Sequence, residues 1–411
     1  MRKQRGYVFH KGHSWFVRYF DNVVEKDGTI RRRQMCKRLP VDYGGQYRSE
    51  RSVARFVEDI LRPINSGKAD PQGTMMVADY IETHYFPFVC ERLRASTLSG
   101  YRYIFNEHLK PHLGDVSMRD FRTFHGEKLM QEVARRAELS TNTLKHLKHF
   151  LTGVFRQALR LGVIEGENVM REVSVPQGKE TADTYAYDLR QVRQIVEALA
   201  DNETAQAVVL VAAYSGLRKG EIRGLLWKDY SGHELSVERS VWKNTVNAPK
   251  TRSSKATVPV IKQLAEALDR HRERMGKLAQ PDTFIFQAGN GQPLNLDNTA
   301  RRVIRPALRK CVLCGKMKPE HGQDGHEFQP LPRWHGWHAF RRGLATTLNA
   351  LGVDDKATQT ILRHSDIKLT QNIYMKPQAE VKRGAMEVLE TKLLESEKCN
   401  DSATPHRGVL N

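Results

Sequence analysis

The chain has 411 residues, with 66 Lys or Arg against 47 Asp or Glu, and a formal net charge of +19. This length favours two or three domains, and the charge favours a polyanionic partner, because neutralising phosphates releases condensed counterions. No apolar run of about eighteen residues could span a bilayer, and the first residues lack the apolar core of a secretion signal, so we expect a cytoplasmic protein without a membrane partner.

Residues 1–62 are predicted to form a small basic β domain. Aromatic and other residues alternate in WFVRYF (15–20), and a second extended run, IRRRQMCKRL (30–39), follows a turn. Residues 1–40 contain eleven Lys or Arg and three acidic residues. Basic side chains among aromatic ones suit a sheet that enters the major groove of DNA, although a solvated basic edge has the same composition. The candidate DNA contacts here are Arg31, Arg32 and Arg33.

Residues 75–174 are predicted to form a domain of four helices. After Ser140, apolar residues recur every three or four positions, which is typical of one buried helix face. Lys145 and Lys148 lie between the apolar positions, so they belong to either a solvated face or a phosphate-binding one. The candidate helix N-caps are Ser96, Ser117 and Ser140.

A polar stretch at 175–187 is interpreted as a linker, and 188–396 as a mixed domain of helices and short strands. The segment NAPKTRSSKATVPV (247–260) predicts a β-hairpin, with two extended runs around a basic turn. The polar residues 397–411 are expected to fray. The predicted fold class is therefore multidomain and mainly α with small β-sheets (α+β).

Four short boxes in the mixed domain carry residues suited to phosphate chemistry. Breaking a phosphodiester bond without a metal needs a nucleophile, cations for the non-bridging oxygens and an acid for the leaving oxygen. Guanidinium groups suit the cation role because their planar fork donates two parallel hydrogen bonds to phosphate. The candidate residues are Arg218 and Glu221 in SGLRKGE, Lys250 in the hairpin (with Lys255 as competitor), His338 and Arg341 in WHAFRR, and His364 and Tyr374 in HSDIKLTQNIY.

The boxes, in this order, resemble the tyrosine recombinase (phage integrase) family. That family has an Arg in a G-L-R-x-x-E box, a Lys in a β-hairpin, an H-x-x-R box, a second His or Trp, and a nucleophilic Tyr. The resemblance implies a site-specific recombinase that cuts and rejoins DNA through a 3′-phosphotyrosyl intermediate, with no cofactor for catalysis. By the same resemblance Tyr374 attacks the phosphate, Arg218 (supported by Glu221), Arg341 and His364 bind its oxygens, Lys250 is the general acid, and His338 assists proton transfer.

The resemblance extends to the other domains. It implies that 1–62 binds arm-type DNA sites and that 75–174 is a SAM-like domain that binds core sites. The partners it implies are double-stranded DNA, three further copies in a homotetramer on synapsed DNA, and DNA-bending accessory proteins, in a bacterial cytoplasm. Two departures stand out, since Arg363 replaces a usual Gly and Gly343 replaces a common Ser or Thr.

Two alternatives remain open at this stage. A catalytically silent, DNA-binding relative would have the same domains, and a type IB topoisomerase-like enzyme shares the chemistry. The intact set of catalytic residue types disfavours the first, and the arm-like β domain disfavours the second.

An insertion at 311–335 precedes the H-x-x-R box and has the spacing C-x2-C-x6-H-x4-H. Two thiolates and two imidazoles bind Zn²⁺ tetrahedrally in structural sites, so we expect a structural zinc here. An insertion with reduced cysteines and no metal is the alternative. The expected ligands are Cys311, Cys314, His321 and His326, with His335 in reserve.

Overall fold

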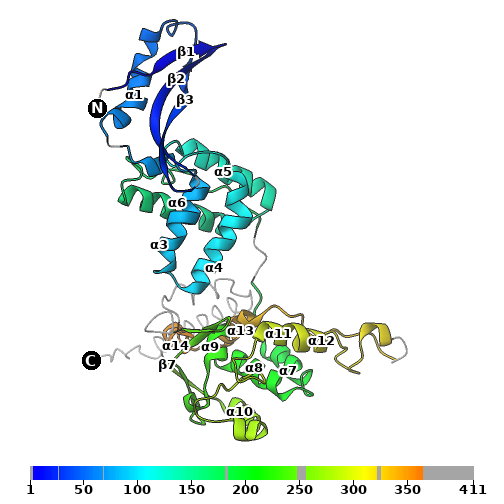
Figure 1. Cartoon of the computed structure of the whole chain (residues 1–411). Coiled ribbons are helices and arrows are strands. Elements are labelled where there is room, and N and C mark those ends of the chain that lie inside the picture. Colours follow the sequence, from blue (N-terminus) through cyan, green and yellow to red (C-terminus); the bar gives the residue numbers. More distant parts are fainter. Residues whose placement is uncertain are drawn as a thin grey trace, which may run out of the picture. The chain divides into compact units, whose positions relative to one another are not determined.

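The computed structural model describes residues 3–25, 27–67, 69–180, 184–247, 256–321 and 325–363. They belong to two compact units, Met1–Ala182 and Asp183–Asn411, drawn in Figure 1. Helices predominate and the sheets are small and antiparallel, which confirms the predicted α+β class. Among the described residues no helix is both long and apolar enough to cross a membrane.

The first unit begins with a three-stranded antiparallel sheet covered by one helix. The strands are β1 (Tyr7–Lys11), β2 (Ser14–Val24) and β3 (Ile30–Asp42), in the order β1-β2-β3. Alternation along β2 turns Trp15, Val17 and Tyr19 inward, where they pack against α1 (Ala54–Asn65). The sequence analysis missed α1, although Val53, Val57 and Leu61 recur at the four-residue spacing of a helix face.

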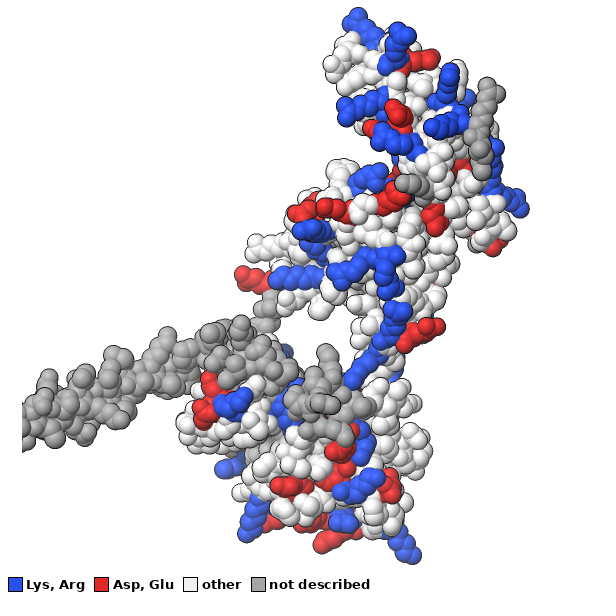
Figure 2. All heavy atoms as spheres, turned by 90° about the vertical axis from the view of Figure 1, so that its left-hand side faces the viewer, with Lys and Arg blue, Asp and Glu red and all other residues white. Residues whose placement is uncertain are grey.

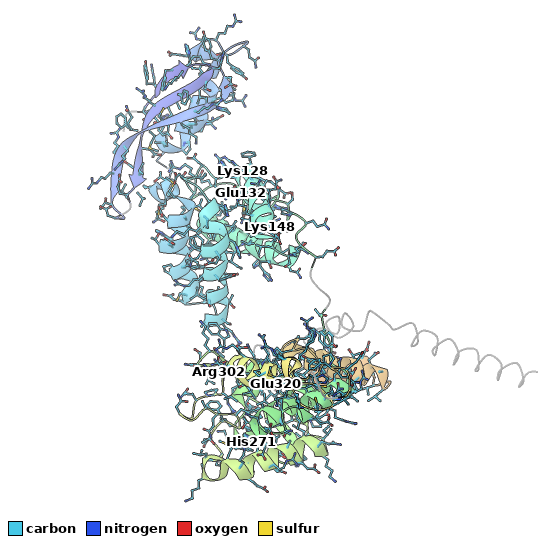
Figure 3. The ribbon with its side chains drawn as sticks, turned by 90° about the vertical axis from the view of Figure 1, so that its right-hand side faces the viewer. Lys128, Glu132, Lys148, His271, Arg302 and Glu320 are labelled. Carbon is cyan, nitrogen blue, oxygen red and sulfur yellow. The ribbon has the colours of Figure 1, made fainter. Side chains whose placement is uncertain are left out.

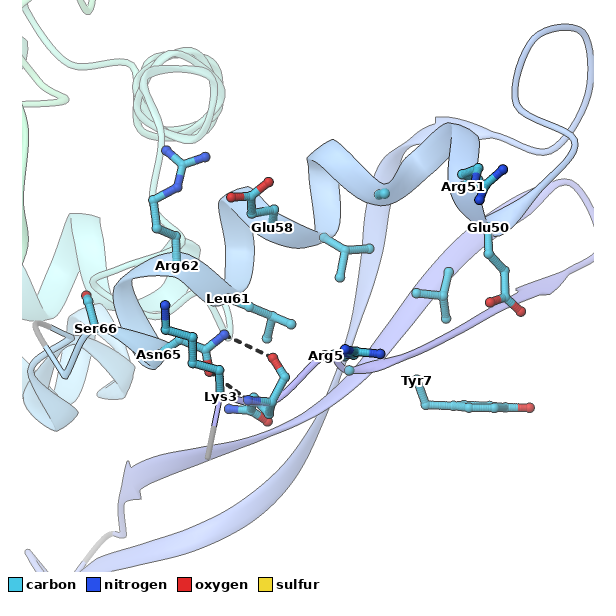
Figure 4. Close-up of a pocket in the computed structure, with 15 residues that line it drawn as sticks. Lys3, Arg5, Tyr7, Glu50, Arg51, Glu58, Leu61, Arg62, Asn65 and Ser66 are labelled. Atoms are coloured by element: carbon cyan, nitrogen blue, oxygen red, sulfur yellow. Dashed lines mark hydrogen bonds between the residues drawn. The ribbon is translucent and has the colours of Figure 1, made fainter. Parts of the chain in front are cut away.

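The segment before β1 is fastened to α1 and β2 (Figure 4). Gln4 and Asn65 exchange two hydrogen bonds of 3.0 Å, and the Gln4 side chain exchanges two more with the backbone of Phe20. Beside this clamp lies an open hollow of about 1480 Å³, lined by Arg5, Glu58 and other residues of mixed charge. Through Gln4, these bonds connect the end of α1 to the central strand β2.

Four helical segments follow in the first unit, as predicted. The first segment, 77–90, consists of α2 (Val77–Tyr80), a π turn (Ile81–Tyr85) and α3 (Phe86–Cys90). The second, 95–109, consists of α4 (Ala95–Ile104) and a π turn (Phe105–Leu109). The third and fourth are α5 (Thr123–Ala137) and α6 (Thr141–Arg160). Ser140 caps α6 by accepting a hydrogen bond from the Thr143 N–H, as expected. The prediction for Ser96 is wrong, because Arg94 is the N-cap of α4, and Ser117 lies in an isolated β-bridge with Met76.

Each of the three π turns ends two residues before a proline. The turns end at Tyr85, Leu109 and Ile304, and the prolines are Pro87, Pro111 and Pro306. A proline has no N–H to donate, and its ring crowds the carbonyl one turn earlier, so the preceding turn widens. The sequence thus explains where these helices depart from α geometry.

The sheet and the helical bundle of the first unit are joined by charged contacts. Arg119 donates to Asp21 at 2.6 Å, and Asp21 is 6% exposed. Lys37 forms an ion pair with Asp120, and the Val24 N–H donates to the Thr74 hydroxyl at 3.1 Å. A nearly buried aspartate needs such a partner, because an isolated buried charge is costly.

The second unit is built around α8 (Glu203–Tyr214), which is apolar on nearly all sides and buried. Helices α10 (Lys262–Met275) and α13 (Trp337–Ala350) pack against it. The other helices are α7 (Leu189–Glu197), α9 (Lys219–Gly224), α11 (Leu296–Thr299), α12 (Arg305–Ala307) and α14 (Asp355–Leu362), with a π turn at Ala300–Ile304 between α11 and α12.

The strand pairing differs from the predicted hairpin at 247–260. Strand β6 (Thr245–Asn247) pairs with β5 (Ser240–Trp242), and β7 (Ala256–Pro259) pairs with β4 (Glu234–Val237). The described residues on either side of the basic turn therefore pair with earlier strands. Strand pairing is a long-range contact, and the local alternation from which the hairpin was predicted does not specify it.

Gly343 is required by the packing of α13. A Cβ at this position would lie 2.1 Å from the Tyr187 carbonyl oxygen. The same stretch is hydrogen-bonded to the helix, because the Tyr187 N–H donates to the Ala339 carbonyl at 3.3 Å. A Ser or Thr here would displace the entry segment of the unit, which explains this departure from the family pattern.

Candidate active site

The first site residues lie at the start of α9. Arg218 is its N-cap, and the Glu221 carboxylate accepts a hydrogen bond from the Arg218 backbone N–H at 2.9 Å and from its Nη1 at 2.8 Å. The Glu221 side chain is 5% exposed, whereas that of Arg218 is 40% exposed. Glu221 therefore holds the Arg218 guanidinium in place while leaving it open to solvent.

Arg363, the residue at the usual glycine position, is the second partner of Glu221. Its Nη2 donates to the Glu221 Oε2 at 2.8 Å, and the residue is 3% exposed. Its backbone has φ 56° and ψ 45°, the left-handed conformation that glycine adopts most easily, at the C-cap of α14. Burial raises the pKa of Glu221, but Arg363 and Arg218 outweigh it and lower the pKa, so the carboxylate stays ionised.

Arg341 lies on α13 and is 1% exposed. Its two Nη atoms donate to the carbonyl oxygens of Gly216 and Leu362, while its Nε has no hydrogen-bond partner among the described residues. Burial, and then repulsion from Arg218 and Arg363, lowers the pKa of Arg341 to about 9. An anion bound here would relieve that repulsion.

His338 precedes Arg341 by one helical turn and lines a hollow of about 520 Å³ together with Arg342 and Lys219. Part of its surface is exposed to solvent. Desolvation of the ring, and then repulsion from Arg342, Arg341 and Arg218, lowers the pKa of His338 to about 4. Its imidazole is therefore neutral at neutral pH and able to accept a proton.

The structure brings Arg218, Glu221, His338 and Arg341 to one site, as the order of the boxes suggests. Lys250, His364 and Tyr374, together with Lys255, lie outside the described residues. The sequence analysis noted Arg363 only as a departure and missed its bond to Glu221. A charged residue at a position where glycine is usual was the available signal.

The four expected metal ligands also come together. The Sγ atoms of Cys311 and Cys314 and one ring nitrogen each of His321 and His326 lie within 4.8 Å of one another. The Cys311 Sγ is 3.6 Å from the His326 Nε2, which is 3.1 Å from the His321 Nε2. Tetrahedral Zn²⁺ with bonds of about 2.0–2.3 Å places its ligand atoms roughly 3.3–3.8 Å apart, so small shifts of these side chains would let the four residues hold this ion.

The turn around Cys311 is shaped for a thiolate. The Cys311 N–H donates to the Lys316 carbonyl at 2.8 Å, and the Gly315 N–H donates back to the Cys311 carbonyl at 3.0 Å. Burial raises the pKa of the Cys311 thiol, but hydrogen bonds from the backbone N–H groups of Gln329, Leu313 and Cys314 and from His326 lower it to about 5. The thiolate is the form of cysteine that binds a metal, and a lowered pKa favours it.

His335, the reserve ligand, has a different position. Its ring stacks on Tyr185 with the centroids 3.7 Å apart, and its backbone N–H donates to the Tyr187 hydroxyl at 2.7 Å. It is absent from the group of residues whose ligand atoms converge. The four other residues complete a tetrahedral set without it.

The candidate DNA contacts of the first unit are divided between the two faces of its sheet. Arg32 pairs with Asn22 on the face away from α1, whereas Arg31 and Arg33 face the other side and Arg33 forms an ion pair with Glu25. The three consecutive arginines therefore do not form one patch. In the view of Figure 2, Lys and Arg side chains are scattered over this unit, with Asp and Glu side chains among them.

The face of the sheet away from α1 also carries cations among aromatic rings. Arg18 lies over Phe9 at 4.7 Å, and Arg32 lies over Phe20 at 5.1 Å. Arg18 was missed by the sequence analysis, although the alternation along WFVRYF places it on the same face as the exposed Phe20.

The two lysines of α6 have different surroundings. Lys145 is exposed, while Lys148 is half-buried and donates to the Arg171 carbonyl at 3.1 Å. Figure 3 shows Lys148 and Lys128 on the side of the bundle formed by α5 and α6.

Each unit contains a segment that matches a known protein family. Residues 187–380 match the Phage integrase family, and residues 81–133 match the Phage integrase, N-terminal SAM-like domain. A Tyrosine recombinase XerC-like protein of Caldanaerobacter subterraneus subsp. tengcongensis is 24% identical in an alignment of 392 positions that covers 88% of this chain and 94% of that protein. An Integrase of Streptomyces ambofaciens is 24% identical in an alignment of 349 positions that covers 81% of this chain and 84% of that protein.

Solved structures share the fold. The Tn1549 transposon integrase in complex with transposon right end DNA has a TM-score of 0.60 at 21% identity and covers 77% of this chain and 100% of that chain. A lambda integrase dimer bound to a core site has a TM-score of 0.54 at 15% identity, with 89% and 93% covered, and a lambda integrase tetramer bound to a Holliday junction has 0.54 at 14%, with 90% and 95% covered.

The bond between Arg363 and Glu221 is testable by unfolding. Arg363→Met would leave Glu221 buried with only Arg218 as its cation, and we expect the free energy of unfolding in urea to fall by about 3 kcal/mol at pH 7. Arg363→Gly should be roughly 1 kcal/mol more stable than Arg363→Met, because glycine adopts the left-handed conformation at lower cost.

Arg190→Met, a change at an exposed arginine on α7, is the control and should alter stability by less than about 0.5 kcal/mol. The double variant Arg363→Met/Glu221→Gln should recover part of the loss, since position 221 then no longer buries a carboxylate that has lost one of its two cations. An Arg363→Met protein as stable as the original would contradict this account.

The protonation of His338 is testable by NMR of labelled histidine rings, assigned with His338→Asn. We expect a midpoint near pH 4 in the DNA-free protein, and a higher one in Arg342→Gln, which removes a nearby cation. The folded-state pKa lies below the usual value of about 6.5, so this group lowers stability as pH falls from about 6.5 towards 4. A midpoint at the usual value would show that the guanidinium groups do not act on this ring.

Proposed function

The chain belongs to the phage integrase family of tyrosine recombinases and is a site-specific DNA recombinase; we propose that it cuts and rejoins DNA through Tyr374. The observation that carries this proposal is the convergence of Arg218, Glu221, His338 and Arg341 in one site. The family match spans positions 364 and 374, where the sequence has the expected His and Tyr.

The proposed reaction conserves the number of phosphodiester-type bonds. The Tyr374 oxygen attacks the scissile phosphorus, its bond to the 5′ oxygen breaks, and a 3′-phosphotyrosyl link and a free 5′ hydroxyl result. Attack by a 5′ hydroxyl of the partner strand reverses the step, so no external energy source is needed.

The residues of the site divide the work between charge and proton transfer. Arg218, oriented by Glu221 and 40% exposed, meets the non-bridging oxygens, and Arg341 adds positive charge from behind it. His338, neutral at neutral pH, accepts the proton of the tyrosine hydroxyl. By family resemblance, Lys250 protonates the leaving oxygen and His364 donates a further hydrogen bond to the phosphate.

The assembly and setting are further parts of this proposal. Solved integrases of the same fold bind DNA as dimers and as a tetramer on a Holliday junction, and we extend the tetramer to this chain. The sheet of the first unit would bind arm sites, its helical bundle core sites, and DNA-bending proteins would bring the two together. The reaction would integrate or excise a phage or other mobile element in the bacterial cytoplasm.

We also propose that Cys311, Cys314, His321 and His326 hold one structural zinc ion. Two thiolates and two neutral imidazoles give a closed tetrahedral set, with no open position for a substrate. The thiolate-stabilising turn at Cys311 supports the proposal, because these N–H groups would otherwise face an uncharged sulfur. The metal would fasten the insertion rather than take part in strand cleavage.

The nucleophile is tested by covalent trapping. The protein is incubated with a duplex that carries a candidate attachment site and a nick beside the cleavage position, and adducts are resolved on a denaturing gel. We expect an adduct that is absent with Tyr374→Phe and retained with Tyr103→Phe, an exposed tyrosine in the first unit.

An adduct that persists in Tyr374→Phe would refute the assignment of the nucleophile. No adduct on DNA that the protein binds would favour the catalytically silent relative. Relaxation of any supercoiled plasmid without joining of sites would favour the topoisomerase-like alternative.

The zinc site is tested by metal analysis of protein purified under reducing conditions. We expect about one equivalent of zinc, falling below roughly a tenth in Cys311→Ser, because the loss of one thiolate weakens a four-ligand site severely. Cys90→Ser, which changes an exposed cysteine of the first unit, should keep the metal. Less than about a tenth of an equivalent in the unmodified protein after exposure to zinc would overturn the proposal.

A further inference from the structure

Cations follow the surface of the second unit from the hollow beside His338 to the cysteine–histidine cluster. They lie on the helical segment 296–307, on the turn after it and on the insertion, and all are exposed except Lys310, which is half-buried. We call this set the basic strip, and its members are Arg301, Arg302, Arg305, Arg309, Lys310 and Lys318.

The strip begins next to the active site. Arg301 and Arg305 line the same hollow as His338, and their spacing of four residues places them on one face of the helical segment. Arg309 follows in the turn after α12, eight residues along the chain from Arg301, and extends the row of exposed cations towards the insertion.

The far end of the strip belongs to the insertion. Residues 309–333 contain five Lys or Arg and three Asp or Glu. Zinc bound by two thiolates and two neutral imidazoles carries no net charge, so the metal would leave this segment positive. Figure 3 shows Arg302 and Glu320 on the same side of the unit.

We infer that the basic strip binds the phosphate backbone of duplex DNA flanking the cleaved phosphate, with the insertion as an added DNA-contacting finger. This inference rests on the proposed recombinase function. The positive charge of the strip favours DNA over a second copy of the protein as the molecule that binds there. Val312 and Leu313 are exposed on the insertion and would suit a protein contact, but a protein surface would have to pair or desolvate the surrounding cations.

The test is the salt dependence of duplex binding by the full-length protein. A fluorescein-labelled random 60-base-pair duplex is titrated at several salt concentrations, with Arg302→Ala/Arg309→Ala/Lys318→Ala as the strip variant. The control variant, Lys262→Ala/Arg270→Ala/Lys277→Ala, removes three exposed cations from α10 and the residues just after it. In Figure 1, α10 lies across the unit from α11 and α12.

We expect the slope of log K against log salt concentration to be smaller by about 2–3 in the strip variant, because each phosphate contact contributes about 0.9. The control should change the slope by less than about 0.5. Zinc content and urea unfolding, measured on the same samples, show whether the insertion is still folded.

Different results separate this inference from the other proposals. Equal slopes in the strip variant and the control would overturn it, while leaving the metal and the nucleophile untouched. If the purified protein holds no zinc and the strip variant still has a smaller slope than the unmodified protein, the result would support the strip and refute only the metal site. An unchanged slope with an altered oligomeric state would overturn the inference in favour of a contact between copies.

Discussion

The active site depends on one buried carboxylate shared by two guanidinium groups. Glu221 accepts hydrogen bonds from the Arg218 backbone, the Arg218 side chain and the Arg363 side chain. Burying a single charge would cost several kcal/mol, and only this full set of partners makes the position tolerable. Because Arg218 opens α9 and Arg363 closes α14, the same carboxylate also joins two segments that are more than 140 residues apart in the chain.

Arg341 forms the second link, and it completes the electrostatic character of the site. Its bonds to the carbonyls of Gly216 and Leu362 tie α13 to the residues that precede Arg218 and Arg363. Arg341 makes no hydrogen bond to Glu221, so one carboxylate faces three guanidinium groups, and burial together with the remaining positive charge lowers the pKa of both Arg341 and His338. A DNA phosphate would supply the negative charge that balances these guanidinium groups, so the site is arranged for its substrate before binding.

The sequence predicted Arg218, Glu221, His338 and Arg341 as candidate site residues from their types and their order, and the structure brings these four together. Arg218 and Glu221 are three residues apart on one helical turn, and so are His338 and Arg341, so local periodicity sufficed to pair them. The Glu221–Arg363 bond joins distant segments, and nothing local predicts it. The same limit applies to the predicted hairpin at 247–260, because β7 pairs with the earlier strand β4 and residues 248–255 lie outside the described part of the chain.

The insertion is anchored separately from the catalytic helix that it precedes. The Tyr187 hydroxyl donates to the Arg333 carbonyl at 2.8 Å and accepts from the His335 N–H, while the His335 ring stacks on Tyr185. These contacts fix the chain just before α13 begins, so the position of His338 does not rely on the cysteine–histidine cluster. A metal held by the cluster could therefore order the insertion without taking part in the chemistry at His338.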